Sequence, residues 1–407
     1  TSRSIDESAP EILLGKVAIL VAGIPNLLTV ESKEWPMRSI EEPLQERLIR
    51  GPREGFTEVI HVNVALVRRR LPDPMLKVKF TTVGRRSHTK VSIMYIEDVC
   101  NMKTVGEIEE RVNAIDIDGI LDPGALAELI TERNVSPFPL FASTERPDKV
   151  VGGLLQGKVA IISDGSPFAM LAPSAAEDFF QTPEDYYLHP LLATTGRLMR
   201  LGGLFMGTTL VAAFTAVISY HYEILPSNIV VFVAATREPV PFTPLTEALL
   251  LEFAVELLRE ASIRLPGPIG PTLSIVGALI LGQAAVSARL ISPVMLIFVA
   301  VSFIGGSIIP NYEGAAVARW LRIPILLAAG LLGGFGIVVT WMVIFAHLCN
   351  LQSFGVPYMT PLAPLTISAM GDFVYRKPWR WMRERPDVLA KKNITRQRGV
   401  EEDENRD

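Results

Sequence analysis

The sequence predicts an α/β soluble head of two similar subdomains, followed by an all-α polytopic transmembrane domain. Up to residue 200 the 407-residue chain mixes charged and apolar residues as soluble proteins do, whereas residues 201–371 contain several long apolar stretches with few charges. Residues 201–220 carry no charge, and crossing a bilayer takes roughly 20 consecutive apolar residues. An internal repeat in the polar half supplies the third observation.

The repeat consists of Gly-Lys-Val-Ala-Ile at residues 15–19 and again at 157–161, each copy followed by a Gly or Pro turn. A short β-branched apolar run that ends in such a turn is typical of a buried strand. The second copy is preceded by a strand candidate at 91–97 and a helix candidate at 104–115. We therefore expect subdomains at 1–90 and 91–196, the first of them truncated at its N-terminus, where the chain lacks an initiator Met.

A helix with a basic end is expected between the two copies. Phe56, Ile60, Val64 and Val67 share one face of this helix. Three arginines follow at its C-terminal end, where they complement the helix dipole. The simplest interpretation is a packing helix with a solvated end; the alternative is an oligomer interface made by Arg53, Glu54, Arg68, Arg69 and Arg70.

Composition and spacing argue against several functional classes. The net charge is -4, and no basic run alternates with aromatic residues, so we expect no nucleic-acid partner. Cys100 and Cys349 are too few for a disulfide framework, and the five histidines show no metal-ligand spacing. Asp164, Gly165, Ser166 and Pro167 lack the spacing and the Lys of a nucleotide loop, which favours a strand-ending turn. We expect no enzyme activity, metal or cofactor.

About four membrane spans are expected, at 201–220, 272–288, 292–310 and 323–348. Arg197 and Arg200 precede the first span, which places the head in the cytoplasm by the positive-inside rule. The transmembrane domain would occupy 197–375, and 376–407 would form a charged, disordered cytoplasmic tail. Arg319 and Arg322 conflict with this topology, because they would lie outside. Residues 229–235 are too short to cross and are expected to form a re-entrant or interfacial turn.

The segment 245–264 predicts a helix of a different kind. Glu252, Glu256 and Glu260 recur every four residues and form a charged stripe, which is typical of a helix in the membrane surface or beside a water-filled vestibule. Glu247 projects from the apolar side instead. Ionisable groups at membrane depth are costly, so Glu247 is a candidate functional carboxylate.

Residues 272–290 have two different faces. One gathers small residues, which let helices approach closely in lipid: Ser274, Gly277, Ala278, Ala284, Ala285 and Ala288. The opposite face carries Thr272, Val276, Leu279, Gln283 and Ser287. If several copies surround an axis, this face lines a pore with Val276 and Leu279 as an apolar constriction. The alternative is an ordinary buried helix with one hydrogen-bonded Gln.

Several motifs, in one order along nearly the whole chain, closely resemble the A subunits of bacterial spore germinant receptors. They are RGPREGFTE at 50–58 with Asn63 and the three arginines, YIE at 95–97, DIDGI at 116–120, TERP at 144–147, DGSP at 164–167, EDYY at 184–187 and GQAAV at 282–286. The resemblance departs from the family at Thr243, where another proline is common, and at the late N-terminus.

This resemblance implies a multi-pass protein of the spore inner membrane that works with a transporter-like B subunit and a lipoprotein C subunit. It also implies a homo-oligomeric ring that forms a nutrient-gated cation channel. The alternative is a non-conducting scaffold that assembles the B and C subunits. A secondary transporter ranks last, because the apolar half shows no inverted repeat.

Overall fold

The computed structural model describes residues 16–19, 28–31, 41–43, 45–131, 136–265, 269–366, 370, 372–386, 388–390 and 393–397. These residues form two compact units, which are described separately. The head comprises the described residues up to Gly196 and from Cys349 onward, and the helical unit comprises Arg197–Leu348.

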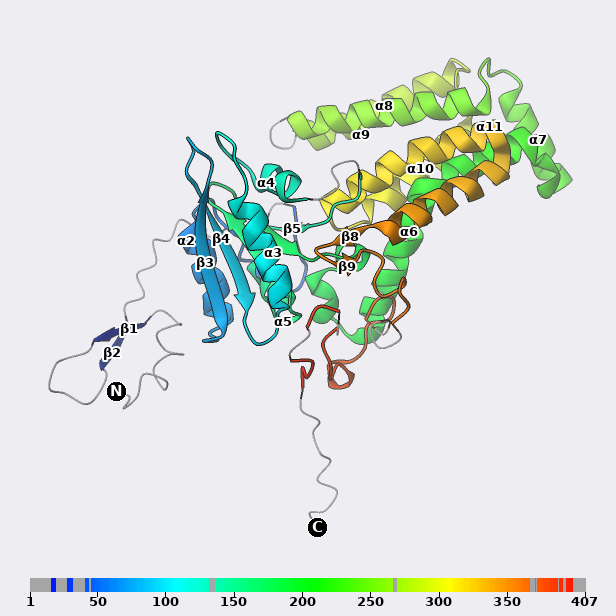
Figure 1. The fold of residues 1–407 in the computed structure, drawn as a ribbon. Helices are drawn as coiled ribbons and strands as arrows, with labels where there is room; N and C mark the ends of the chain where they lie inside the picture. Colours follow the sequence, from blue (N-terminus) through cyan, green and yellow to red (C-terminus); the bar gives the residue numbers. More distant parts are fainter. Residues whose placement is uncertain are drawn as a thin grey trace, which may run out of the picture. The chain divides into compact units, whose positions relative to one another are not determined.

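The head contains a five-stranded antiparallel sheet in the order β3-β4-β6-β7-β5 (Figure 1). Its strands are β3 (Leu76–Val83), β4 (Thr89–Ile96), β5 (Ala142–Thr144), β6 (Val159–Ser163) and β7 (Ala169–Ala172). The head helices are α2 (Ile60–Arg70), α3 (Met102–Asn113), α4 (Pro123–Ile130) and α5 (Pro147–Leu155), with 3-10 helices η1 (Ala176–Phe179), η2 (Pro183–Tyr186) and η4 (Trp379–Trp381). Two further two-stranded sheets pair β1 (Lys16–Ile19) with β2 (Leu28–Glu31) and β8 (Gln352–Ser353) with β9 (Val356–Pro357).

Both faces of the five-stranded sheet are buried. On β4, Val91, Ile93 and Tyr95 join the core beneath α3 and α4, whereas Met94 and Ile96 join the core beneath α2 and α5. Successive side chains of a strand point to opposite faces, so a strand covered on both sides needs an almost unbroken apolar run. The apolar stretches expected to form strands at 91–97 and 159–163 have this character.

The division of the head into subdomains at residue 90 is not what the structure shows. Strands β3 and β4 form one hairpin across that boundary, paired from Leu76 with Ile96 to Val83 with Thr89. Asp164 also accepts a hydrogen bond from the backbone N–H of Ile60, at the start of α2, over 3.0 Å. The repeat does mark two strands, β1 and β6, but residues 15 and 20–23 of the first copy lie outside the described residues.

The basic helix and the helix after it agree with the sequence prediction. Helix α2 ends in Arg68, Arg69 and Arg70, and its apolar stripe is buried. Phe56 belongs to that stripe in packing, although it lies in the loop before the helix. Helix α3 corresponds to the helix predicted at 104–115, but it begins and ends two residues earlier. It begins at Met102 because the side chain of Asn101 caps it by accepting from the N–H of Lys103.

The C-terminal segment differs from the disordered tail expected after residue 375. Met382 and Ala390 are buried in the head, and the side chain of Arg385 donates to the carbonyl of Leu155 over 2.8 Å. Trp379 packs against Tyr186, with ring centroids 5.8 Å apart. The boundary differs as well, since the chain rejoins the head at Cys349. The prediction of disorder rested on the high charge of the segment and did not consider the few apolar side chains that hold it. Residues 398–407 lie outside the described residues.

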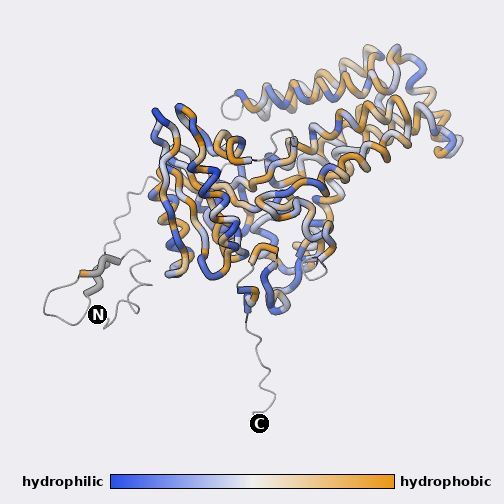
Figure 2. The backbone as a smooth tube through the Cα atoms, in the orientation of Figure 1, coloured by the Kyte–Doolittle hydropathy of each residue, from blue (hydrophilic) through white to orange (hydrophobic). Residues whose placement is uncertain are grey.

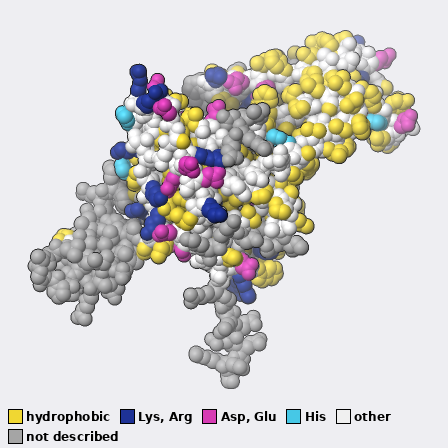
Figure 3. Space-filling model, in the orientation of Figure 1, with side chains coloured by type: hydrophobic (Ala, Val, Ile, Leu, Met, Phe, Trp, Pro, Cys, Tyr) yellow, Lys and Arg dark blue, Asp and Glu magenta, His cyan; other side chains and the backbone are white. Residues whose placement is uncertain are grey.

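The helical unit is built from helices of different lengths, most of them rich in apolar residues. They are α6 (Pro190–Tyr220, which begins in the head), α7 (Ser227–Arg237), α8 (Pro244–Arg264), α9 (Ile269–Ser287), α10 (Pro293–Ser307) and α11 (Tyr312–Asn350), with a short 3-10 helix η3 (Tyr222–Ile224). Among the described residues, α6 and α11 are long and apolar enough to cross a membrane. Figure 2 shows that hydrophobic residues dominate along these helices, and in Figure 3 they cover much of the surface of this unit.

Two predicted boundaries in this half change. Helix α11 begins at Tyr312 rather than near residue 323, so Arg319 and Arg322 lie within a helix and not in an outer loop. The segment 229–235, expected to be a turn, is part of α7. The turn was predicted because the apolar run is short. The helix is longer than this run because it includes polar residues at both ends, from Ser227 to Arg237.

Burial makes Cys100 a test of the head fold. Burial raises the pKa of its thiol to about 12. Only a thiolate reacts rapidly with alkylating agents, so at pH 8.5 we expect Cys100 to stay unmodified in the folded full-length chain. Mass spectrometry after iodoacetamide treatment measures this, with denatured chain as the control. Rapid alkylation of Cys100 in folded protein contradicts this packing.

Candidate functional site

The helical unit contains a fully buried carboxylate, Glu247, in the first turn of α8. Helix α8 begins here because Thr243 caps it and Pro244 occupies its first position, and a negative side chain in the first turn suits the helix dipole. One oxygen of Glu247 accepts from the backbone N–H and the hydroxyl of Ser292, both over 2.6 Å. The other accepts from Arg237 over 2.7 Å. Glu247 therefore joins α7, α8 and the start of α10.

A second buried pair extends the network to α11 and α6. Arg322 donates to Glu252 over 2.6 Å, and the two side chains are each about 6% exposed. The Nε of Arg322 also donates to the carbonyl of Gly207 on α6 over 2.8 Å. Sequence reasoning treated Arg322 as a charge in a loop, where it conflicted with the predicted topology. Its partner Glu252 lies 70 residues away along the chain, so the pairing could not be seen from local sequence.

The charged stripe of α8 is consequently not uniform. Glu252 is buried, whereas Glu256 pairs with Arg259 and Glu260 pairs with Arg264 on the helix surface. The sequence prediction of an acidic, solvated stripe describes only the last two turns. Glu247 is buried like Glu252, and its three hydrogen bonds give it a structural part in holding helices together.

Helices α6 and α10 cross at a glycine contact that sequence reasoning missed. A Cβ built on Gly207 would lie 2.7 Å from the backbone N of Gly306, and one on Gly203 would lie 2.7 Å from the carbonyl oxygen of Gly305. Ser302 of α10 donates to the carbonyl of Gly207 over 2.9 Å. The detectable signal was the four-residue spacing of Gly203 and Gly207, which is typical of close helix packing in membranes.

The predicted pore face of α9 is exposed on the single chain. Val276 and Leu279 are 46% and 58% exposed, and Thr272, Gln283 and Ser287 are also exposed. On the opposite face Gly277 lies against Leu258 of α8, and on the flank between the two faces Gly282 approaches Leu296 of α10. Ala278, Ala284 and Ala288 remain exposed, so the small-residue face is only partly packed within one chain, and the side chain of Ser274 lies outside those described.

Helix α11 is broken at Gly333, whose φ of 63° interrupts the helical backbone. The end of α6 satisfies the groups freed by this break. The hydroxyl of Tyr220 donates to the carbonyl oxygens of Gly330 and Leu331 over 2.8 and 3.1 Å, and Nε2 of His221 accepts from the N–H of Gly334 over 3.2 Å. Adjacent glycines are a common cause of kinks, so the pair at 333 and 334 was the available signal.

The arginines predicted as an oligomer interface have partners within the chain. Arg69 and Arg70 both pair with Glu54, the latter over 2.8 Å. Arg53 is exposed, and Nε of Arg68 is buried without a hydrogen-bond partner among the described residues. These ion pairs join α2 to the preceding loop, so a contact with a neighbouring copy stays a prediction.

No cluster of His, Cys, Asp or Glu able to hold a metal occurs among the described residues. The polar groups at the centre of the helical unit instead pair with one another. Their geometry suits holding apolar helices in one arrangement and gives no indication of bond-making chemistry.

Residues 1–388 match the family described as Bacillus/Clostridium GerA spore germination protein. The chain belongs to this family. Spore germination protein KA of Bacillus subtilis (strain 168) is 40% identical over 97% of this chain and 73% of its own length. YfkQ of the same bacterium, an uncharacterized membrane protein, is 39% identical over 96% of this chain and 76% of its own.

One solved structure is also similar. It is the N-terminal domain of the A subunit of the Bacillus megaterium spore germinant receptor GerK3, 36% identical, covering 44% of this chain and 62% of that chain with a TM-score of 0.32. The family match over residues 1–388 confirms the resemblance inferred from sequence motifs at the level of the family. The family is described by its part in germination and not by an enzyme reaction.

The glycine contact predicts opposite effects at two glycines of α6, Gly207 and Gly202. Gly207→Ala should lower the free energy of unfolding by about 1–3 kcal/mol, because its methyl group meets backbone atoms of α10. Gly202→Ala is the matched control, since a Cβ there meets nothing within 4 Å. Removing a helical glycine should stabilise by about 0.5–1 kcal/mol. Thermal unfolding in detergent measures both; equal shifts would refute the contact.

Glu247 and Glu260 form the second matched pair. Glu247→Ala leaves Arg237 and the N–H of Ser292 without their acceptor, and removing one partner of a buried pair costs about 3–5 kcal/mol. Glu260→Ala removes only a surface pair with Arg264, worth about 0.3–0.5 kcal/mol. Thermal stability in detergent should fall sharply in the first variant alone. A Glu247→Ala protein as stable as the Glu260→Ala protein would contradict this account.

Proposed function

We propose that this chain is the A subunit of a nutrient germinant receptor and that its copies form a nutrient-gated cation channel. Family membership and relatives named as spore germination proteins support the germination part of this proposal. The helices α6 and α11, long and apolar enough to cross a membrane, support a membrane location. We place the protein in the spore inner membrane with the head and the C-terminal segment in the spore core.

The exposed polar groups of α9 carry the channel proposal. Gln283 and Ser287 lie on the same helix face as Val276 and Leu279, and all four are exposed on the single chain. An amide facing lipid leaves its hydrogen-bonding groups unsatisfied, which is costly, so this face suits water or another copy of α9. A ring of such faces provides a polar path with an apolar constriction that closes by dewetting.

The acidic residues of α8 take two different parts in this proposal. Glu256 and Glu260 have side chains about half exposed and would attract cations at a pore mouth, weakened by their pairing with Arg259 and Arg264. Glu247 pairs with Arg237 and Ser292, and Glu252 pairs with Arg322, so we assign both carboxylates to holding the helices and not to the vestibule.

Partners follow from the same proposal. The B and C subunits of the receptor would contact the helical unit within and beside the membrane, and the nutrient signal would pass through these contacts. The basic end of α2 would contribute to contacts between heads, with Arg53 the exposed member of that group.

The channel is tested by two leucines of α9 with similar exposure on opposite faces. Leu279 is 58% exposed and lies on the proposed pore face, whereas Leu281 is 52% exposed and lies on the other. Leu279→Ala should shorten the apolar constriction and raise nutrient-independent K⁺ leak about tenfold, equivalent to about 1.4 kcal/mol in the barrier. Val276→Ala should act in the same direction, and Leu281→Ala should leave the leak unchanged.

The measurement is K⁺ flux through liposomes that contain the purified receptor, together with particle symmetry from electron microscopy. Equal leak in the Leu279→Ala and Leu281→Ala proteins would remove α9 from the pore. A ring without current under any nutrient condition would favour the non-conducting scaffold. A strictly solitary chain would refute a shared pore.

A further inference from the structure

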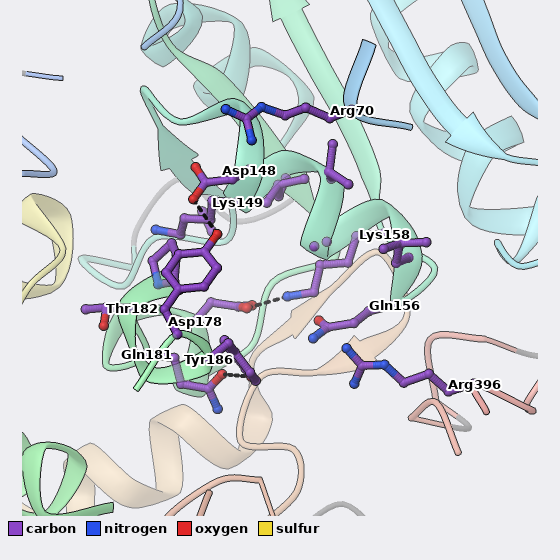
Figure 4. Close-up of a pocket in the computed structure, with 18 of the residues that line it drawn as sticks. Arg70, Asp148, Lys149, Gln156, Lys158, Asp178, Gln181, Thr182, Tyr186 and Arg396 are labelled. Atoms are coloured by element: carbon purple, nitrogen blue, oxygen red, sulfur yellow. Dashed lines mark hydrogen bonds and ion pairs between the residues drawn. The ribbon is translucent and has the colours of Figure 1, made fainter. Parts of the chain in front are cut away.

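A cavity of about 350 Å³ lies in the head, between α5, the sheet, η2 and the C-terminal segment. This volume falls in the range of small-molecule sites. A second cavity of about 610 Å³ adjoins it and shares four lining residues: Gln156, Lys158, Gln181 and Arg396. Figure 4 shows that the side chains of Gln156, Lys158 and Arg396 extend in the same direction, toward Asp178, Gln181 and Tyr186.

The first cavity has an excess of positive charge. The cations in its wall are Arg70, Lys149, Lys158 and Arg396, and the carboxylates are Asp148 and Asp178. Arg70 and Lys149 pair with Glu54 and Glu46, each over 2.8 Å, so the cations left for a ligand are Lys158 and Arg396. Both carboxylates already have partners. Asp148 accepts from Nε and a terminal nitrogen of Arg146 over 3.0 Å each, and from the hydroxyl of Tyr187 over 2.8 Å. Asp178 pairs with Lys158 and also accepts from the N–H of Ala175 over 2.8 Å.

Arg396 is the cation best placed to bind a ligand. Within the described part of the chain no carboxylate pairs with it; its guanidinium lies over the ring of Trp379, 4.9 Å from the centroid. Its backbone N–H donates to the carbonyl of Arg383 over 2.8 Å, which fixes its position. The side-chain amide of Gln156 likewise has no hydrogen-bond partner among the described residues. The shared wall therefore presents an oriented guanidinium and an amide beside Lys158.

We propose that this cavity binds a small organic carboxylate. The carboxylate would accept hydrogen bonds from Arg396 and Gln156, with the charge of Lys158 close by, because charge-assisted bonds to guanidinium are the strongest available here. Val151, Leu155 and Leu171 form the aliphatic part of the wall, so the ligand carries an apolar body. Inorganic phosphate lacks that body and is expected to bind more weakly.

The site is independent of the channel, because every residue that forms it belongs to the head. In this proposal the C-terminal segment supplies part of the binding site. Trp379 and Arg396 reach the cavity only because this segment folds back onto the head.

The test uses the purified full-length chain in detergent and three probes: benzoate, its neutral isostere benzamide, and inorganic phosphate. Isothermal titration should show benzoate binding at least tenfold more tightly than benzamide or phosphate. Arg396→Gln should weaken benzoate about tenfold, equivalent to about 1.4 kcal/mol. Arg380→Gln is the matched control: it makes the same charge change in the same segment at a residue that lines a different cavity. We expect it to leave benzoate affinity unchanged.

Three results would overturn the proposal. Absence of benzoate binding, or equal affinity for benzamide, would remove the carboxylate site. Equal losses in the Arg396→Gln and Arg380→Gln proteins would show a general effect of charge. The last alternative is that the chain's own acidic terminus occupies the cavity, and replacing Glu401, Glu402, Asp403 and Glu404 by Gln tests it. Benzoate binding that appears only in this variant would mean that the chain's own acidic terminus fills the cavity.

Discussion

Glu247 and Glu252 of α8 set the arrangement of the helical unit. Apolar helices pack against one another with little directional preference in lipid, whereas a buried carboxylate is stable only next to its own donors. Glu247 is bound by Arg237 of α7 and Ser292 at the start of α10, and Glu252 by Arg322 of α11, which reaches Gly207 of α6. The glycine contact between α6 and α10 brings that carbonyl within reach. Five helices are thus related through two side chains.

Helix α9 stands outside this polar network. Gly270 of α9 lies against the carbonyl oxygens of Ser262 and Leu265, and Gly277 and Gly282 lie against Leu258 and Leu296. Gln283 and Ser287 are exposed on the single chain, and this arrangement underlies the proposal that α9 meets water or other copies.

The head relies on a different constraint, since its sheet is covered on both faces. The C-terminal segment adds Ala390 to the core beneath α2 and α5 and places Trp379 over Tyr186. Residues more than 200 positions apart in the chain therefore build the cavity in the head. The cations of this cavity come together only because the chain returns to the head. Neither Lys158 nor Arg396 lies in a sequence motif that predicts ligand binding.

The sequence by itself determined what local patterns encode. Unbroken apolar runs predicted β4 and β6, the spacing of Val105, Ile108 and Val112 predicted α3, and the uncharged run at 201–220 predicted the long helix α6. Family motifs placed the chain among spore germination proteins, because they need only residue identity and order. The tertiary structure alone decided how distant residues pair: the hairpin across residue 90, the partner of Arg322 and the folded C-terminal segment. Periodicity reports which face of an element is buried, but the partner that buries it depends on the path of the whole chain.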